Sequence, residues 1–142
     1  MFANLLEFAG NHWDLVGAFI GAVLALYIYE SRKQGKTLTP QELVGKMNRD
    51  KAVVLDLRDQ KDFRLGHITH AKNLPYNELQ TRLGELAPMK EQPLVVVCSL
   101  GQYSGAAAKT LHQLGFKDVL RLSGGMSAWT AQGLPVVKGA KR

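Results

Sequence analysis

Two short apolar runs constrain the fold of this chain more than any other feature of its sequence. Residues 52–57 read AVVLDL and residues 93–98 read PLVVVC, and in both runs the apolar side chains follow one another without alternation. A continuous apolar run of this length is typical of a strand that is buried on both faces, as the strands of parallel sheets are. The two runs therefore predict central strands of a parallel sheet.

Helical signals alternate with these strands. Thr39, Pro40 and Glu42 supply an N-cap, a first-turn proline and a capping-box glutamate, which together predict a helix to about Met47. Further helices are expected over residues 60–65, 76–86, 104–114 and 124–133, and further extended segments over 71–74, 118–122 and 134–137. This alternation predicts an α/β domain with a mostly parallel central sheet flanked by helices, whose ligands bind at the carboxyl ends of the strands.

A separate apolar segment precedes this domain. Residues 15–29 carry no charge, Trp13 lies just before them, Tyr29 ends them, and basic residues follow. Aromatic residues at both ends of an apolar helix, with basic residues on its cytoplasmic side, are typical of membrane spans. We therefore expect one transmembrane helix over residues 13–29 in contact with lipid, with residues 1–12 outside and the rest of the chain in the cytoplasm.

Two other interpretations of this segment remain open. A cleaved signal peptide requires a positively charged start and a small-residue cleavage site, and the sequence has neither. A buried helix of a soluble core is favoured by the short length of the run and by Asp14 near its edge. For a helix that does span a membrane, the spacing of Gly17 and Gly21 lets two copies approach closely, which predicts a homodimer seam.

Charge is distributed unevenly along the chain. The 142 residues carry a net charge of +6, yet residues 1–30 contain three acidic and no basic side chains. Residues 30–37 are expected to form a basic juxtamembrane linker, residues 38–137 the domain and residues 138–142 a basic tail. The basic side chains are scattered and not interleaved with aromatic ones, so no nucleic-acid partner is expected. An anionic lipid surface accounts for the charge more simply.

Cys98 is the only cysteine of the chain, and it ends the second apolar run. A glycine-containing loop follows it, and then a predicted helix from Ser104. A free cysteine is either a small buried apolar residue or a nucleophile held as a thiolate by backbone N–H groups and the positive end of a helix. The strand end, the glycine loop and the helix start together favour the nucleophile. One cysteine allows no internal disulfide, and without neighbouring ligands no metal site is expected.

Two further segments carry a specific resemblance. Residues 56–75, DLRDQKDFRLGHITHAKNLP, resemble the first signature of the rhodanese family, and residues 122–129, LSGGMSAW, are similar to its second signature. Cys98 falls between them, in the position of the family's active site. The resemblance covers residues 38–137. With the apolar segment in front, the chain looks like the membrane-anchored single-domain rhodanese-like proteins of bacteria, which implies a single-pass protein of the cell inner membrane.

The resemblance implies a cofactor-free sulfurtransferase. Cys98 would attack a sulfane-sulfur donor, become a persulfide and pass the outer sulfur to a thiophilic acceptor, the donor being thiosulfate, a polysulfide or a protein persulfide. The residues implied in substrate binding are Arg58, Ser99, Leu100, Gly101, Gln102, Tyr103 and Ser104. The residues implied in the frame of the site are Asp56, His67, Gly124 and Gly125.

Individual roles stay open within this resemblance. Asp56 and Arg58 serve either as scaffold or as substrate contacts, and Asp62, four residues after Arg58, is a candidate ion-pair partner for it. His67 is interpreted as a hydrogen-bonded turn residue rather than as a general base. The loop 99–103 carries no charged side chain, which favours a donor that is bulkier or less charged than the thiosulfate dianion.

Two alternative functions belong to other classes. The related phosphatases have a longer loop with an arginine that binds the phosphate dianion, and this loop has no arginine. A catalytically weak module of the same fold would instead bind a membrane-protein partner. Retention of Cys98 in an open glycine loop favours the enzyme over the binding module.

Overall fold

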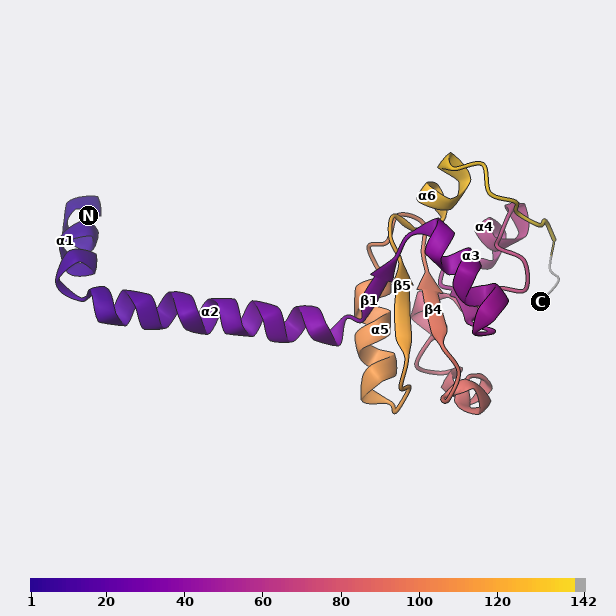
Figure 1. The fold of residues 1–142 in the computed structure, drawn as a ribbon, viewed down its shortest axis with the longest axis horizontal. Helices are drawn as coiled ribbons and strands as arrows, with labels where there is room; N and C mark the ends of the chain where they lie inside the picture. The colour runs from indigo at the N-terminus through magenta and orange to yellow at the C-terminus, as the bar shows by residue number, and fades with distance from the viewer. Residues whose placement is uncertain (140–142) are drawn as a thin grey trace. The chain divides into compact units, whose positions relative to one another are not determined.

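The computed structural model describes residues 1–139, which divide into two compact units (Figure 1). The first unit contains α1 (Phe2–Asn11) and α2 (Trp13–Lys33). The stretch Trp13–Arg32 of α2 is long and apolar enough to cross a membrane, by length and composition, and none of it is buried in the described structure. The first residues of the predicted linker are therefore helical. α1 lies in a segment for which the sequence pattern predicts no regular element.

The second unit is built around a five-stranded sheet whose strands all run parallel, in the order β1-β5-β4-β2-β3. The strands are β1 (Lys36–Leu38), β2 (Val53–Asp56), β3 (Lys72–Asn73), β4 (Leu94–Val97) and β5 (Val119–Leu122). The two apolar runs form β2 and β4, which pair with each other at the centre of the sheet. The predicted parallel α/β fold is confirmed.

Four helices flank this sheet: α3 (Pro40–Arg49), α4 (Gln60–Leu65), α5 (Ser104–Gln113) and α6 (Gly125–Ala131). At the start of α3 the Thr39 side chain accepts from the Glu42 amide, and the Glu42 carboxylate accepts from the Thr39 amide, so the predicted capping box is present. Each of these helices follows a parallel strand, and its N-terminus therefore lies at the carboxyl edge of the sheet.

The prediction of a helix over residues 76–86 is wrong. In its place the structure has two short 3₁₀ turns, η1 (Tyr76–Glu78) and η2 (Leu83–Glu85), and a third, η3 (Ala87–Met89), follows directly. Leu79 and Leu86 are buried as their spacing suggested, but Gly84 within the segment and Pro88 just after it disfavour a continuous α-helix. The apolar spacing therefore indicated burial correctly and the type of helix incorrectly.

Strand β1 occupies the end of the predicted linker. Lys36, Thr37 and Leu38 pair with the outer side of β5, and the first two are exposed. An edge strand this short and this polar has no apolar run that would reveal it in the sequence. Of the predicted basic tail 138–142, residues 140–142 lie outside the described residues.

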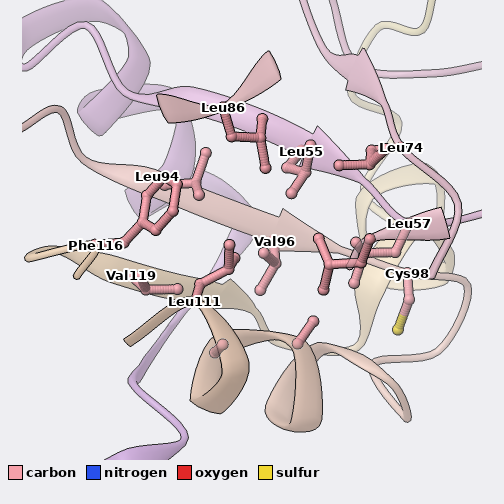
Figure 2. Packing of buried hydrophobic residues seen from close by; sticks show 13 residues of the cluster. Leu55, Leu57, Leu74, Leu86, Leu94, Val96, Cys98, Leu111, Phe116 and Val119 are labelled. Carbon is pink, nitrogen blue, oxygen red and sulfur yellow. The ribbon is translucent and has the colours of Figure 1, made fainter. Parts of the chain in front are cut away.

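Two apolar clusters sandwich the sheet. On one face the side chains of Leu94, Val96 and Cys98 follow one another along β4 and beyond it, and they pack with Leu111 of α5 (Figure 2). On the opposite face residues of β2, β4 and β5 pack against α3, α4 and α6, with Trp129 buried among them. Because both faces of β4 are covered, all four of its residues are buried, which explains the uninterrupted apolar run.

Candidate active site

Cys98 lies directly after β4, one residue beyond the strand that it was predicted to end. The neighbouring strand β2 ends in register with it, and the Leu57 amide continues the pairing by donating to the Val97 carbonyl at 2.8 Å. The carboxyl ends of the two central strands thus bring Leu57, Arg58 and Cys98 to one edge of the sheet, with the sulfur beyond the row of core side chains (Figure 2). The Cys98 residue is only 1% exposed.

The sulfur of Cys98 accepts one backbone hydrogen bond. The Gly101 amide donates to Sγ at an N···S distance of 2.8 Å. The thiol in turn is a donor toward Oε1 of Gln102, at an S···O distance of 4.0 Å, and the same oxygen accepts from the Leu100 amide at 3.1 Å. A backbone N–H directed at sulfur stabilises the thiolate, which is the nucleophilic form of cysteine. The loop thus brings Gly101 and Gln102 to the sulfur, whereas the Leu100 amide is engaged elsewhere.

The remaining loop residues shape this cradle. Gly101 has a φ of +94°, in the left-handed region that glycine adopts without strain. Ser104, the first residue of α5, is buried and donates its hydroxyl to the Gly101 carbonyl at 2.8 Å. That carbonyl is thereby engaged, while the Gly101 amide bonds the sulfur. Ser104 therefore donates its one hydroxyl proton to the loop backbone rather than to the sulfur.

The start of α6 holds the other side of the loop. The Met126 amide donates to the Cys98 carbonyl at 2.8 Å, and the Ser127 amide donates to the Ser99 carbonyl at 3.0 Å. Gly124 and Gly125 turn the chain into α6 with φ values of +72° and +58°. A Cβ on Gly125 would lie 2.2 Å from the Cys98 carbonyl oxygen, so only glycine fits there. The double glycine places α6 against the Cys98 loop.

Asp56 and Arg58 form a nearly buried ion pair. Arg58 donates from Nε to Oδ1 of Asp56 at 3.0 Å and from Nη2 to Oδ2 at 2.8 Å. Nη2 also donates to the Gly66 carbonyl at 2.7 Å, and Asn73 donates to the Arg58 carbonyl at 2.8 Å. The side chains of Asp56 and Arg58 are 1% and 12% exposed. Arg58 pairs with Asp56 rather than with Asp62, and this geometry fits a structural frame.

His67 is a buried turn residue. Its Nδ1 lies 2.7 Å from the Phe63 carbonyl, which fits a donated hydrogen bond, and its ring stacks on the Phe63 ring with centroids 3.7 Å apart. Its backbone exchanges two hydrogen bonds with Val137, at 2.9 and 2.8 Å, so the extended segment after α6 is tied to this turn. His67 does not line the pocket that holds Cys98. This position does not suit a general base.

A pocket of about 320 Å³ opens over the thiol. It is lined by Leu57, Arg58, Asp59, Asp62, Tyr76, Asn77, Cys98, Ser99 and Tyr103. The rings of Tyr76 and Tyr103 stack at this pocket, with centroids 5.2 Å apart and an interplanar angle of 24°. Of the residues predicted to bind substrate, Arg58, Ser99 and Tyr103 line the pocket, whereas Leu100, Gly101, Gln102 and Ser104 do not.

Sequence reasoning assigned no place in the site to five residues of this pocket, Leu57, Asp59, Asp62, Tyr76 and Asn77. Asp59 follows the end of β2, and Tyr76 and Asn77 follow the end of β3. The available signal was their position after strands, because residues that follow parallel strands gather at one edge of the sheet. A larger hollow of about 550 Å³ beside α4 and β3 contains neither Cys98 nor any residue of its loop, so we place the site at the smaller pocket. Within residues 1–139 no group of His, Cys, Asp and Glu is arranged to bind a metal ion.

The fold and this loop define a class of protein: a parallel α/β domain in which a single thiol lies at the end of a central strand and faces a small pocket. The family model described as Rhodanese-like domain matches residues 39–132. The chain therefore belongs to the rhodanese-like domain family.

Relatives and solved structures agree with this assignment. The chain is 33% identical over 140 residues to the uncharacterized protein YibN of Escherichia coli K12, covering 96% of this chain and 98% of YibN. It is 42% identical over 94 residues to the thiosulfate sulfurtransferase GlpE of Shewanella oneidensis, covering 66% of this chain and 91% of GlpE. The crystal structure of a rhodanese-related protein from Thermoplasma volcanium matches with a TM-score of 0.67 and 28% identity, covering 73% of this chain and 99% of that one.

Proposed function

We propose that this protein is a sulfurtransferase that carries sulfane sulfur as a persulfide on Cys98. The observation that carries the proposal is the hydrogen bond from the Gly101 amide to Sγ at 2.8 Å, because it stabilises a thiolate at the base of a pocket. Family membership and the similarity to GlpE, a thiosulfate sulfurtransferase, support the same chemistry. Thiosulfate, a polysulfide and a protein persulfide are the candidate donors.

The reaction divides into two displacements at sulfur. The Cys98 thiolate attacks the sulfane sulfur of the donor, a new S–S bond forms, and the S–S bond of the donor breaks. When thiosulfate is the donor, sulfite is the leaving group. A thiophilic acceptor such as cyanide or a thiolate then attacks the outer sulfur, the persulfide S–S bond breaks, and Cys98 regains its thiolate. The Gly101 amide stabilises the anionic sulfur in the free state and Gln102 lies beside it. Each displacement is balanced and needs no cofactor.

We further propose that α2 anchors the domain to the cell inner membrane as a single span, with the domain in the cytoplasm. The apolar stretch Trp13–Arg32 supports the span, and the absence of basic residues from positions 1–30 supports this orientation. An antiparallel pair of α2 helices would place the domains on opposite sides, so a homodimer through Gly17 and Gly21 would be parallel. Within the described structure no atom lies within 4 Å of a Cβ placed on either glycine, which leaves both open to lipid or to a second copy.

A binding module is the second candidate function. Cys98 is 1% exposed and its loop 99–103 offers no charged side chain, which would suit a domain that recruits a membrane-protein partner without turnover. Mass spectrometry separates the two candidates. The full chain in detergent is incubated with thiosulfate, a polysulfide or a persulfide donor, and Cys98 is expected to gain the mass of one sulfur atom. The Cys98→Ser variant keeps the size of the side chain and is expected to gain nothing. Absence of the added sulfur with every donor would favour the binding module.

A further inference from the structure

The mouth of the Cys98 pocket combines negative charge with aromatic surface, and this combination selects among sulfur donors. The inference rests on the proposed sulfurtransferase function and concerns its substrate class. The charges that line the pocket are those of Arg58, Asp59 and Asp62. Because a donor reaches the thiol through this mouth, the net charge of these three residues attracts or repels a charged donor.

The positive charge at this mouth is already neutralised. Arg58 is the one basic residue of the described pocket lining, and its Nε and Nη2 are held by Asp56 and the Gly66 carbonyl. Asp59 and Asp62 are both exposed, and among the described residues neither forms an ion pair. With Arg58 and Asp56 cancelling each other, two carboxylates remain, and the mouth is negative.

Other parts of the pocket lining are aromatic and apolar. Tyr76 and Tyr103 stack on each other and remain 39% and 50% exposed, so their surfaces are available to a ligand. Leu57 lies in the same pocket, and Asn77 supplies an uncharged amide. A wall of this kind binds an aromatic or apolar body through surface burial and stacking, and offers little to a small, strongly hydrated anion.

We propose that the pocket selects organic sulfane-sulfur donors with an aromatic or apolar body and at most one negative charge, and that Asp59 and Asp62 reject dianions such as thiosulfate. The class comprises organic persulfides, R–S–SH, and organic thiosulfonates, R–SO₂–S⁻. The Cys98 thiolate attacks the terminal sulfur of a thiosulfonate, the S–S bond breaks, and a sulfinate monoanion, R–SO₂⁻, leaves. With thiosulfate the leaving group is the sulfite dianion, which would have to depart past two carboxylates.

The test compares two donors that share the same reactive sulfur. Benzenethiosulfonate is an aromatic monoanion and thiosulfate a dianion, and sulfur loading of Cys98 in the full chain is followed by mass spectrometry. The wild type should load faster from benzenethiosulfonate. The double variant Asp59→Asn with Asp62→Asn should accelerate loading from thiosulfate by about tenfold and from benzenethiosulfonate by only about threefold, since the effect of removing like charge scales with the charge of the donor. Asp59 is the N-cap residue of α4 but its side chain makes no cap hydrogen bond, and asparagine is equally favoured at this position, so α4 should persist.

A matched control changes the same net charge elsewhere. Glu91 and Asp118 are exposed and lie next to the amino ends of β4 and β5, opposite the edge that holds Cys98. Glu91→Gln with Asp118→Asn should leave the ratio of the two donors unchanged. A control that raises thiosulfate loading as much as the pocket variant would show an effect of net charge alone and would overturn the proposal.

Alkylation of Cys98 separates this proposal from the proposed function. Iodoacetate and iodoacetamide react with the same thiolate and differ by one negative charge, and neither needs sulfur transfer. The pocket variant should raise the rate ratio of iodoacetate to iodoacetamide, and added salt should raise it in the wild type by screening the carboxylates. If the ratio is unchanged in the pocket variant, the proposed selection of donors by charge is overturned, even where sulfur loading of Cys98 succeeds. If Cys98 gains sulfur from neither donor while the alkylation ratio shifts, the proposed sulfurtransferase function is overturned. The effect of the two carboxylates on charged reagents would then stand alone.

Discussion

The N-termini of α3 and α6 occupy equivalent places in the fold, yet their amides are used differently. Both helices follow a parallel strand and begin at the carboxyl edge of the sheet. At α3 the side chains of Thr39 and Glu42 close the helix end on itself. At α6 no side chain caps the helix, and the amides of Met126 and Ser127 bind the carbonyls of the Cys98 loop instead.

The difference shows what turns an equivalent position into a site. The first turn of every helix leaves amides without partners inside the helix, and a self-contained cap consumes them. At α6 the uncapped amides hold the carbonyls of Cys98 and Ser99, and the Gly101 amide remains for the sulfur. The region around α3 should therefore affect stability alone, whereas the start of α6 should affect stability and the thiol together.

The largest expected effect comes from adding one methyl group to Gly125. In Gly125→Ala the new Cβ would lie 2.2 Å from the Cys98 carbonyl oxygen, at a φ of +58° that alanine adopts poorly. We expect a loss of about 4 kcal/mol in the free energy of unfolding, from overpacking and backbone strain together. The rate of Cys98 alkylation should change as well, because the loop has to move. Denaturant unfolding of the full chain in detergent and iodoacetamide labelling measure the two effects.

Gly133 offers the matched control for this variant. It has a φ of +68°, and within the described structure no atom lies within 4 Å of a Cβ placed on it. Gly133→Ala should therefore cost only about 1 kcal/mol, from backbone conformation alone, and should leave Cys98 alkylation unchanged. Equal losses in the two variants would contradict the close contact between α6 and the Cys98 loop.

An intermediate effect is expected from the ion pair that frames the pocket. In Asp56→Asn the guanidinium of Arg58 would keep its place without its carboxylate, and breaking a nearly buried pair costs about 3 kcal/mol. Thermal unfolding followed by circular dichroism measures the loss. Asp59→Asn makes the same chemical change three residues later at an exposed side chain with no ion pair among the described residues, and should be nearly neutral. Similar losses in both variants would count against a structural role for the pair.

How much the sequence could predict differs between these regions for physical reasons. The capping box at Thr39 is local in sequence, and the apolar run before Cys98 reports burial on both faces of β4, so both were predictable. The stacked pair of Tyr76 and Tyr103 joins residues that are distant along the chain, and no local pattern indicates it.

Two further positions, Arg58 and Asp62, show where a local spacing rule fails. A pair of Arg58 with Asp62 assumes a helical turn between them, but α4 begins only at Gln60, and Asp56 lies closer to the guanidinium. The rule that residues four apart face each other thus fails here, because Arg58 lies before the first residue of the helix.

The smallest effect is expected at the self-contained end of α3, and it depends on pH. The backbone amide and the hydroxyl of Thr39 lower the pKa of Glu42 below its ordinary value of 4.5. A carboxyl whose pKa is lower in the folded state stabilises the fold above that ordinary value, and the contribution is lost as the pH falls through the folded pKa. The wild type should therefore melt slightly higher than Glu42→Gln at neutral pH, and the gap should close on acidification. Cys98 alkylation should be the same in both proteins at neutral pH, because this helix end uses its amides internally. A gap that persists in acid, or altered alkylation, would contradict the contrast between the two helix ends.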